Sequence, residues 1–146
     1  MEVSEKKKLL VPEIRFKEFN DQWGEFRLKE TLELLTDFEA NGSFSSVKEN
    51  VTIYDSNNFA WYVRATDLEN QSTSEEVKYV DEKSYEFLKK TKLFGNELLV
   101  AKRGEIGKVY FFENKLKINF ATLAPNLYLL KLNDKVIPKF VYLHFI

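Results

Sequence analysis

The sequence predicts an α+β fold in which a single mixed or antiparallel β-sheet is accompanied by two or three helices. Two observations lead to this class. Short apolar runs, rich in aromatic and β-branched residues, recur between turn signals, as is typical of strands. Other segments show helical spacing of leucines or carry residues that cap helices. The sequence contains no internal repeat, so we expect one main domain.

Six segments have the pattern of strands, because each is apolar or rich in β-formers and most lie next to Gly, Pro, Asn or Asp. They cover residues 61–68, 77–80, 98–101, 109–112, 116–121 and 127–132. The runs at 98–101 and 109–112 flank two glycines, so we expect them to form a hairpin.

Three segments indicate helices. Three leucines recur at helical spacing within residues 25–35. Asp81 is a suitable N-cap for a helix that runs to Lys90. Pro138 fits the first turn of a third helix, and the chain stops at Ile146 in what we expect to be the start of a longer helix.

Composition excludes several classes of chemistry. With 146 residues, 44% of them apolar, the chain can bury a core, and intrinsic disorder is not expected. It has no cysteine, which excludes disulfides, thiolate zinc sites and a cysteine nucleophile. Its one histidine, His144, cannot alone build a catalytic triad or a polyhistidine metal site. No signal peptide and no apolar run of roughly 18 residues is present, so we expect a cytoplasmic protein without a membrane partner.

Charge is distributed unevenly along the chain, although the net charge is only −1. Residues 1–82 carry ten Lys and Arg against 18 Asp and Glu, whereas residues 83–146 carry 12 against five. A chain polarised in this way can attract a polyanion with its positive part. The distribution therefore favours a binding domain.

Positive charge is concentrated in the connection of the expected hairpin. Lys102, Arg103 and Lys108 lie there together with Gly104 and Gly107. Glycines permit tight turns and the close approach of another molecule. We therefore expect a phosphate-bearing partner here, with an ordinary solvated hairpin tip as the alternative. The segment is not a P-loop, because only two residues separate the glycines and a valine follows the lysine.

Two further sets of side chains suit phosphate or base contacts. Ser45, Ser46 and Lys48 follow an Asn-Gly turn and are expected on a loop, where serines are also ordinary turn residues. Arg64 and Thr66 lie two apart in an expected strand and would project from one face. Arg64 has a second interpretation, because it could instead pair with a nearby carboxylate.

The order of these segments resembles the target recognition domain of the specificity subunit of type I restriction-modification systems. The segments that carry the likeness are PEIRF in the N-terminal arm, YVRATDL at 62–68, the helix with Tyr85 and Leu88, LLVAKRGEIGKV at 98–109, the strand with Ile118 and Asn119, and the helix start at Pro138. The resemblance covers nearly the whole chain from about Val11. Asn96 and Glu97 stand where many members of the family have Gly-Asp.

The resemblance implies a reader of double-stranded DNA that is not itself an enzyme. In this family a specificity subunit carries two recognition domains, each reading half of a split target, separated by long helices. Those helices hold modification subunits, which bind S-adenosylmethionine and methylate adenine, and a restriction subunit cleaves DNA with ATP and Mg²⁺. We expect residues 1–10 to be a disordered tail. By this likeness residues 11–137 are the recognition domain and residues 138–146 are the start of the spacer helix. No cofactor or metal is expected in this chain.

Duplex recognition needs cations for phosphates and fork-shaped or amide donors for base edges. The first choices are Lys102, Arg103 and Lys108. The other candidates offer a cation, a hydroxyl or an amide, and they are Arg64, Thr66, Ser45, Ser46, Lys48, Asn119 and Thr122. One domain that reads about three to five base pairs should bind weakly, with a dissociation constant of about 10⁻⁴–10⁻⁶ M.

Two other functions stay open at this point. The chain could be a protein-interaction domain without DNA affinity, which would meet its partner through the acidic residues 36–82 or the C-terminal helix. A nuclease that uses carboxylates alone is the third hypothesis, although no convincing spacing of acidic residues supports it.

Overall fold

The structure, a computed structural model, describes residues 14–18 and 20–146. The chain divides into two units, residues 1–30 and 31–146, and helix α1 (Leu28–Thr31) spans the division. Helices and strands are mixed along the second unit, which confirms the α+β class. The tail expected at residues 1–10 lies outside the described residues.

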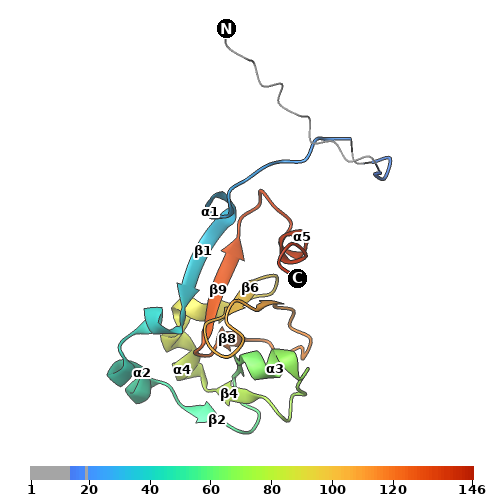
Figure 1. The fold of residues 1–146 in the computed structure, drawn as a ribbon. Coiled ribbons are helices and arrows are strands. Elements are labelled where there is room, and N and C mark those ends of the chain that lie inside the picture. Colours follow the sequence, from blue (N-terminus) through green and yellow to red (C-terminus); the bar gives the residue numbers. More distant parts are fainter. Residues whose placement is uncertain (1–13, 19) are drawn as a thin grey trace. The chain divides into compact units, whose positions relative to one another are not determined.

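The first sheet of the second unit has four antiparallel strands in the order β1-β9-β6-β7. The strands are β1 (Leu32–Asp37), β9 (Leu127–Leu132), β6 (Leu98–Ala101) and β7 (Val109–Phe111). Figure 1 shows β1 and β9 running side by side. Ala101 pairs with Leu127, so β6 ends at the point where β9 begins. The expected hairpin and the expected strand at 127–132 are confirmed.

The second sheet has five strands in the order β2-β4-β3-β8-β5. The strands are β2 (Ile53–Tyr54), β4 (Lys78–Val80), β3 (Ala60–Val63), β8 (Ala121–Leu123) and β5 (Lys92–Leu93). β3 and β8 are parallel, and the other pairs are antiparallel. The expectation of a single sheet is therefore wrong. All four residues of β3 are buried, so both faces of this sheet need a covering layer.

The two sheets share one apolar core. Trp61 and Val63 of β3 belong to the same buried cluster as Leu99 of β6 and Leu129 of β9. Successive side chains of a strand point to opposite faces, so Tyr62 lies in a second cluster on the outer face of the five-stranded sheet. The sheets therefore stack, with helices outside them.

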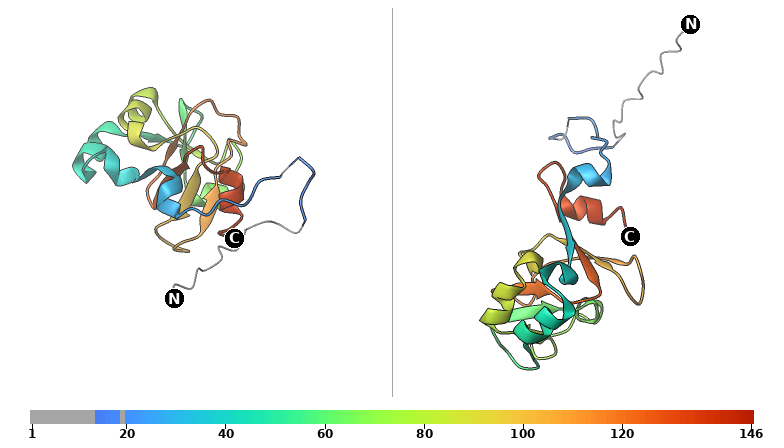
Figure 2. Two further views of the ribbon diagram at one scale, coloured as in Figure 1. Left: turned by 90° about the horizontal axis from the view of Figure 1, so that it is seen from above. Right: turned by 90° about the vertical axis from the view of Figure 1, so that its left-hand side faces the viewer.

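Short helices cover the outer faces. The helical elements are η1 (Phe38–Asn41), α2 (Phe44–Asn50), α3 (Ala65–Glu69), α4 (Glu82–Phe87), η2 (Lys89–Thr91) and α5 (Pro138–Tyr142), with η for 3₁₀ turns. Phe38, Val47 and Tyr85 pack on the five-stranded sheet, whereas Val141 and Tyr142 pack on the four-stranded one. Figure 2 shows α2 and α4 side by side and α5 on the other side of the strands.

The helix expected after Asp81 is confirmed, although it is shorter than predicted. The Asp81 Oδ1 atom accepts a hydrogen bond from the Ser84 backbone N–H at 2.8 Å, as an N-cap should. α4 ends at Phe87, and a 3₁₀ turn replaces its expected last residues. The start of α5 at Pro138 is also confirmed. None of the helices in the described part of the chain is long and apolar enough to cross a membrane.

The helix expected over residues 25–35 is wrong. α1 has only four residues, and β1 begins at Leu32. The leucine spacing is real, but Leu35 pairs with Leu130 and Leu32 with Leu132 across the β1–β9 ladder. Tertiary pairing overrides a weak local helical preference here.

Two expected strands also end differently. The strand predicted over residues 61–68 stops at Val63, because the Asp67 carboxylate accepts the Arg64 backbone N–H at 3.0 Å and begins α3. Residues 116–120 are irregular, with the end of a turn at Leu116 and a bend at Asn119, in place of the predicted strand at 116–121, and β8 begins only at Ala121.

The turn before β6 accommodates Asn96 and Glu97. Gly95 and Asn96 both have positive φ, 109° and 68°. The buried Glu97 carboxylate accepts the backbone N–H groups of Phe94 and Gly95, each at 2.8 Å. Burial raises the pKa of Glu97 above its ordinary value. Asn tolerates the left-handed conformation, and glutamate can reach the turn as aspartate would.

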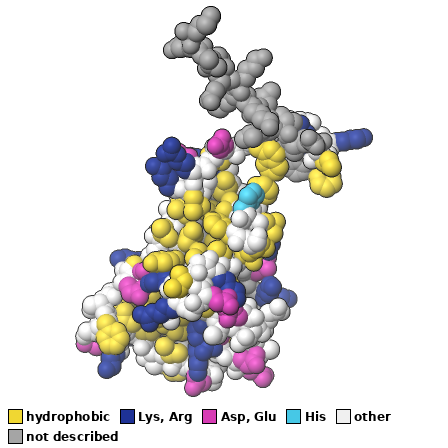
Figure 3. All heavy atoms as spheres, in the orientation of Figure 1, with side chains coloured by type: hydrophobic (Ala, Val, Ile, Leu, Met, Phe, Trp, Pro, Cys, Tyr) yellow, Lys and Arg dark blue, Asp and Glu magenta, His cyan; other side chains and the backbone are white. Residues whose placement is uncertain are grey.

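Apolar side chains are also exposed on the surface. Figure 3 shows them gathered over β1 and β9, whereas charged side chains are more frequent lower in this view. Exposed apolar residues of these strands are Leu34, Leu35 and Tyr128. Ile137, Leu143, Phe145 and Ile146 are exposed in the C-terminal segment.

Candidate nucleic-acid interface

The hairpin loop, residues 102–108, is a closed and internally bonded turn. The Gly107 N–H donates to the Ala101 carbonyl at 3.0 Å, and the Ile106 N–H donates to the Gly104 carbonyl at 3.0 Å. Gly104 and Gly107 have φ of 73° and 87°, which favours glycine, and no atom beyond the adjoining residues lies within 4 Å of a Cβ built on either. The loop therefore presents its outer surface without obstruction.

Lys102 is held at the base of this loop by two carboxylates. Its Nζ atom lies 2.9 Å from Asp37 Oδ2 and 2.7 Å from Glu39 Oε2, and only 18% of its side chain is exposed. Burial lowers the pKa of Lys102, but the hydrogen bonds to Glu39 and Asp37 outweigh burial and raise it overall. The same contact holds the pKa of Asp37 below its ordinary value. Lys102 is therefore a bracing residue and a poor candidate for phosphate.

Lys108 is also paired, but it stays more open to solvent. Its Nζ atom lies 2.6 Å from Glu105 and 3.2 Å from Glu69 at the end of α3. The Tyr110 hydroxyl donates to the same Glu69 carboxylate, and these contacts lower the pKa of Glu69. Burial and this bond raise the pKa of Tyr110 to about 12. Lys108 thus joins the loop to α3 before any ligand arrives.

Arg103 is the cation of the loop that remains available. It is exposed, and among the described residues no hydrogen bond or ion pair engages its guanidinium. The Lys102 N–H next to it donates to the Asn126 carbonyl at 2.8 Å, which fixes the backbone at the point where Arg103 leaves β6. Arg103 therefore projects from a braced backbone.

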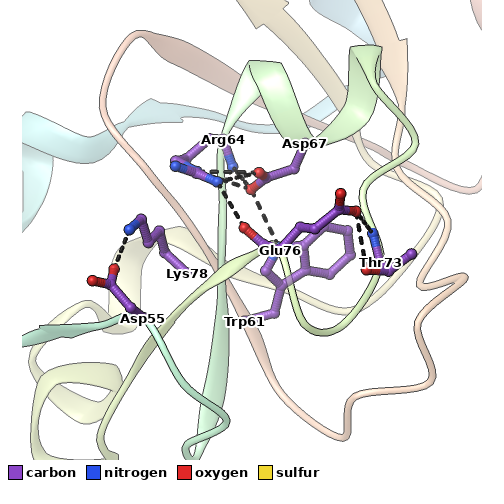
Figure 4. Close-up of polar contacts among 7 residues, drawn as sticks. All are labelled: Asp55, Trp61, Arg64, Asp67, Thr73, Glu76 and Lys78. Atoms are coloured by element: carbon purple, nitrogen blue, oxygen red, sulfur yellow. Dashed lines mark hydrogen bonds and ion pairs between the residues drawn. The ribbon is translucent and has the colours of Figure 1, made fainter.

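Arg64 pairs with a nearby carboxylate, which was the second interpretation of this residue. Its guanidinium contacts the buried Asp67 carboxylate through Nε at 3.1 Å and Nη2 at 2.6 Å, beside the Trp61 indole (Figure 4). Arg64 is the residue before α3, so its side chain and that of Thr66 do not share a strand face as predicted. Thr66 is exposed on α3, the helix whose Glu69 meets Lys108.

The serines and Lys48 lie in α2 and not on the predicted loop. Ser43 caps this helix, since its Oγ accepts the Ser46 N–H, and the Ser45 hydroxyl donates to Glu49 at 3.2 Å. Lys48 is exposed. α2 packs through Val47 on the outer face of the five-stranded sheet, so these residues stand apart from the hairpin layer.

Thr122 is buried and is no longer a candidate for a DNA contact, and Asn119 lies away from the hairpin loop. Thr122 is 0% exposed and its hydroxyl donates to the Thr91 carbonyl at 3.2 Å, so it offers nothing to a duplex. Asn119 is exposed but precedes β8, whereas the hairpin loop lies beyond the other end of that strand. The structure does not bring these two residues to the loop.

One residue beside the hairpin loop, Asn126, was not predicted from the sequence as a site residue. Asn126 is exposed, has φ of 75°, and its carbonyl accepts the Lys102 N–H. In the sequence it is only a turn residue after Pro125. No local signal links it to Arg103, because their proximity depends on the β6–β9 register.

Folding neutralises part of the positive charge near the hairpin with carboxylates from residues 1–82. Lys102 and Lys108 pair with carboxylates from the acidic half of the chain, and Lys131 pairs with Glu33 at 2.8 Å. The described residues around the hairpin therefore do not form a broad cationic face. Recognition there must depend on a few directed contacts more than on bulk charge.

A depression elsewhere on the surface is lined in part by side chains that are already paired within the fold. A depression of about 510 Å³ is lined by Asp55, Ser74 and Tyr79 among others. Asp55 pairs with Lys78, and the Tyr79 hydroxyl donates to the Ser74 carbonyl at 2.7 Å. Within residues 14–18 and 20–146, no group of three or more His, Asp or Glu side chains is arranged to hold a metal ion.

Comparison with known proteins adds no family. The sequence matches no protein-family model, and no curated protein matches it.

Proposed function

We propose that this chain is a non-catalytic DNA-recognition domain that reads one half of a bipartite double-stranded target through the hairpin loop. The observation that carries the proposal is Arg103, an exposed guanidinium on an internally bonded loop whose neighbouring lysines are already paired. Arginine is the side chain best suited to a guanine edge, because its fork bonds O6 and N7 together. The resemblance to type I specificity subunits supports the same function.

The proposal extends to the setting that the family likeness implies. The chain would work in the cytoplasm, bound to modification subunits that carry S-adenosylmethionine, and through them to a restriction subunit that uses ATP and Mg²⁺. Catalysis would belong to those partners. The chain itself would supply only the choice of sequence.

Selection from a duplex pool with randomised central base pairs tests the proposal. The purified chain should enrich a short motif, and Arg103→Ala should weaken binding of that motif about 5- to 150-fold, because a bidentate guanine contact is worth ~1–3 kcal/mol. Arg103→Lys keeps the charge but loses the fork, so it should retain binding to unselected DNA and lose discrimination.

Lys135→Ala is the matched control. Lys135 is exposed and follows β9 at the end opposite to Asn126, about 20 Å along the strand from the hairpin loop. The affinity of the Lys135→Ala variant for the enriched motif should stay within twofold of that of the parent. All three variants should keep the parental melting temperature. Unchanged affinity of Arg103→Ala for the enriched motif would remove the proposed function.

Salt dependence provides an independent measure. The slope of log K against log salt is about −0.9 for each phosphate neutralised. Because Lys102 and Lys108 are internally paired, we expect a shallow slope, of about −1 to −2. A steep slope would place the contact on the unpaired lysines elsewhere on the chain.

A protein-interaction domain without DNA affinity is the second candidate. The exposed apolar residues of the C-terminal segment favour it, with Ile137 69% and Ile146 73% exposed. Sedimentation of the chain with a purified modification subunit and no DNA tests it. This function predicts a complex that resists salt and a chain that enriches no motif from the duplex pool.

A further inference from the structure

Asn126 and Arg103 leave the same edge of the four-stranded sheet. Ala101 pairs with Leu127 across β6 and β9, so the hairpin loop begins where the turn before β9 ends. The hydrogen bond from the Lys102 N–H to the Asn126 carbonyl joins the two loops directly. The two side chains are thus separated by one hydrogen bond and one residue of backbone.

The Asn126 side chain has no structural task among the described residues. It is exposed, and its amide makes no hydrogen bond with any of them. Its backbone adopts a left-handed conformation, at φ 75°, which glycine would adopt at lower cost. Fold stability alone would therefore be served equally well by glycine at this position.

We propose that Asn126 is a specificity-determining residue that reads an adenine edge in the major groove, next to the base contacted by Arg103. This inference rests on the proposed DNA-recognition function. A carboxamide matches adenine, because it accepts from N6 and donates to N7 at the same time. Neighbouring base pairs lie about 3.4 Å apart, so two side chains on joined loops reach the same or adjacent pairs.

The backbone of this site provides the test variant. Asn126→Gly keeps the left-handed turn and removes only the amide, so the fold and the Arg103 contact should survive. Asn126→Asp keeps the size of the side chain but replaces the N7 donor with an acceptor. Both variants and the parent are taken through selection from the randomised duplex pool, and their melting temperatures are measured.

The parent should enrich a motif with an adenine beside the position that Arg103 reads. Replacing that adenine by 7-deazaadenine, which removes the N7 acceptor, should weaken parental binding about tenfold. Asn126→Gly should bind both duplexes equally and should no longer select adenine. Asn126→Asp should also lose the preference.

The outcomes separate this inference from the function on which it rests. If binding depends on Arg103 but Asn126→Gly still selects the same adenine, the inference fails and the recognition function stands. If the parent enriches no motif and binds no duplex, both fail. A parent that does not distinguish adenine from 7-deazaadenine also overturns the role of Asn126.

Discussion

At the scale of single residues, the side chains of this protein divide into those that brace and those that remain available. Arg64, Lys102 and Lys108 are cations whose charge is already met by carboxylates of the fold. Arg103 and Asn126 are polar residues whose side chains make no hydrogen bond or ion pair with the described residues. The sequence lists all five as polar, and only the tertiary pairings separate the two groups.

The buried Asp67 carboxylate shows how much a bracing contact contributes. It accepts the Arg64 backbone N–H and guanidinium and lies 3.5 Å from the Trp61 indole nitrogen. Asp67→Ala should lower the free energy of unfolding by about 2–3 kcal/mol, because hydrogen bonds to a charged group are lost and the Arg64 guanidinium loses its carboxylate. Urea unfolding followed by circular dichroism measures this loss.

Thr66→Ala is the neighbouring control for that measurement. Thr66 is exposed on the same helix, so its substitution should change the free energy of unfolding by no more than about 0.5 kcal/mol. Equal effects of the two substitutions would contradict the bracing role of Asp67.

At the scale of elements, α4 depends on its N-cap. Asp81 Oδ1 accepts the Ser84 N–H, and Oδ2 accepts the Tyr54 hydroxyl at 3.0 Å. Asp81→Ala should destabilise the protein by about 1–2 kcal/mol, whereas Asp81→Asn keeps a capping oxygen and should cost less than half of that. Thermal and urea unfolding at pH 7 check the order of the two variants.

The charge of this cap adds a pH dependence. Hydrogen bonds from Ser84 lower the pKa of Asp81 below its ordinary 3.8, so the carboxylate contributes stability above pH 3.8 that is lost as pH falls through the folded-state pKa. The advantage of the parent over Asp81→Asn should therefore shrink between pH 5 and about pH 2. A constant difference across this range would exclude the charged cap.

Local patterns predict elements well where local and tertiary preferences agree. The apolar runs at 98–101, 109–112 and 127–132 and the Asp81 cap are visible in the sequence and present in the structure. The helix expected at residues 25–35 fails because β9, almost a hundred residues later, pairs with that segment. Long-range pairing of this kind has no local signal.

The same reason limits prediction of the site. Arg103 can be selected from the sequence because a cation between glycines is conspicuous. Lys102 and Lys108 look equivalent to it until Asp37, Glu39 and Glu69 are brought beside them by the fold. Asn126 could not be selected, because its relation to Arg103 exists only in the register of two strands.

For the whole molecule, the lowered pKa values of several carboxylates lead us to expect a loss of stability in acid. Hydrogen bonds and nearby cations or polar groups lower the pKa values of Asp37, Asp55, Glu69, Glu76 and Asp81. Each contributes stability that is present above its ordinary pKa and lost as pH falls through its folded-state pKa. The free energy of unfolding should therefore be level near pH 6 and fall below about pH 4, as urea titrations at successive pH values would show.

Glu97 acts in the opposite direction and offers a check on this prediction. Burial raises its pKa, so its contribution is fully present below its ordinary value of 4.5 and is lost as pH rises through the folded-state pKa. Glu97→Gln removes this opposing contribution. Its stability should fall more steeply on acidification than that of the parent, and parallel curves would contradict the assignment.

The position of β9 between β1 and β6 has a consequence for biosynthesis. Neither β1, at residues 32–37, nor the edge of β6 that faces β9 has its neighbour until residues 127–132 leave the ribosome. The parallel pairing of β3 with β8 waits in the same way for residues 121–123. A nascent chain therefore carries unpaired strand edges until residues 121–132 have been synthesised, and the pairing of β8 and β9 is the step that closes the fold and shields it from aggregation.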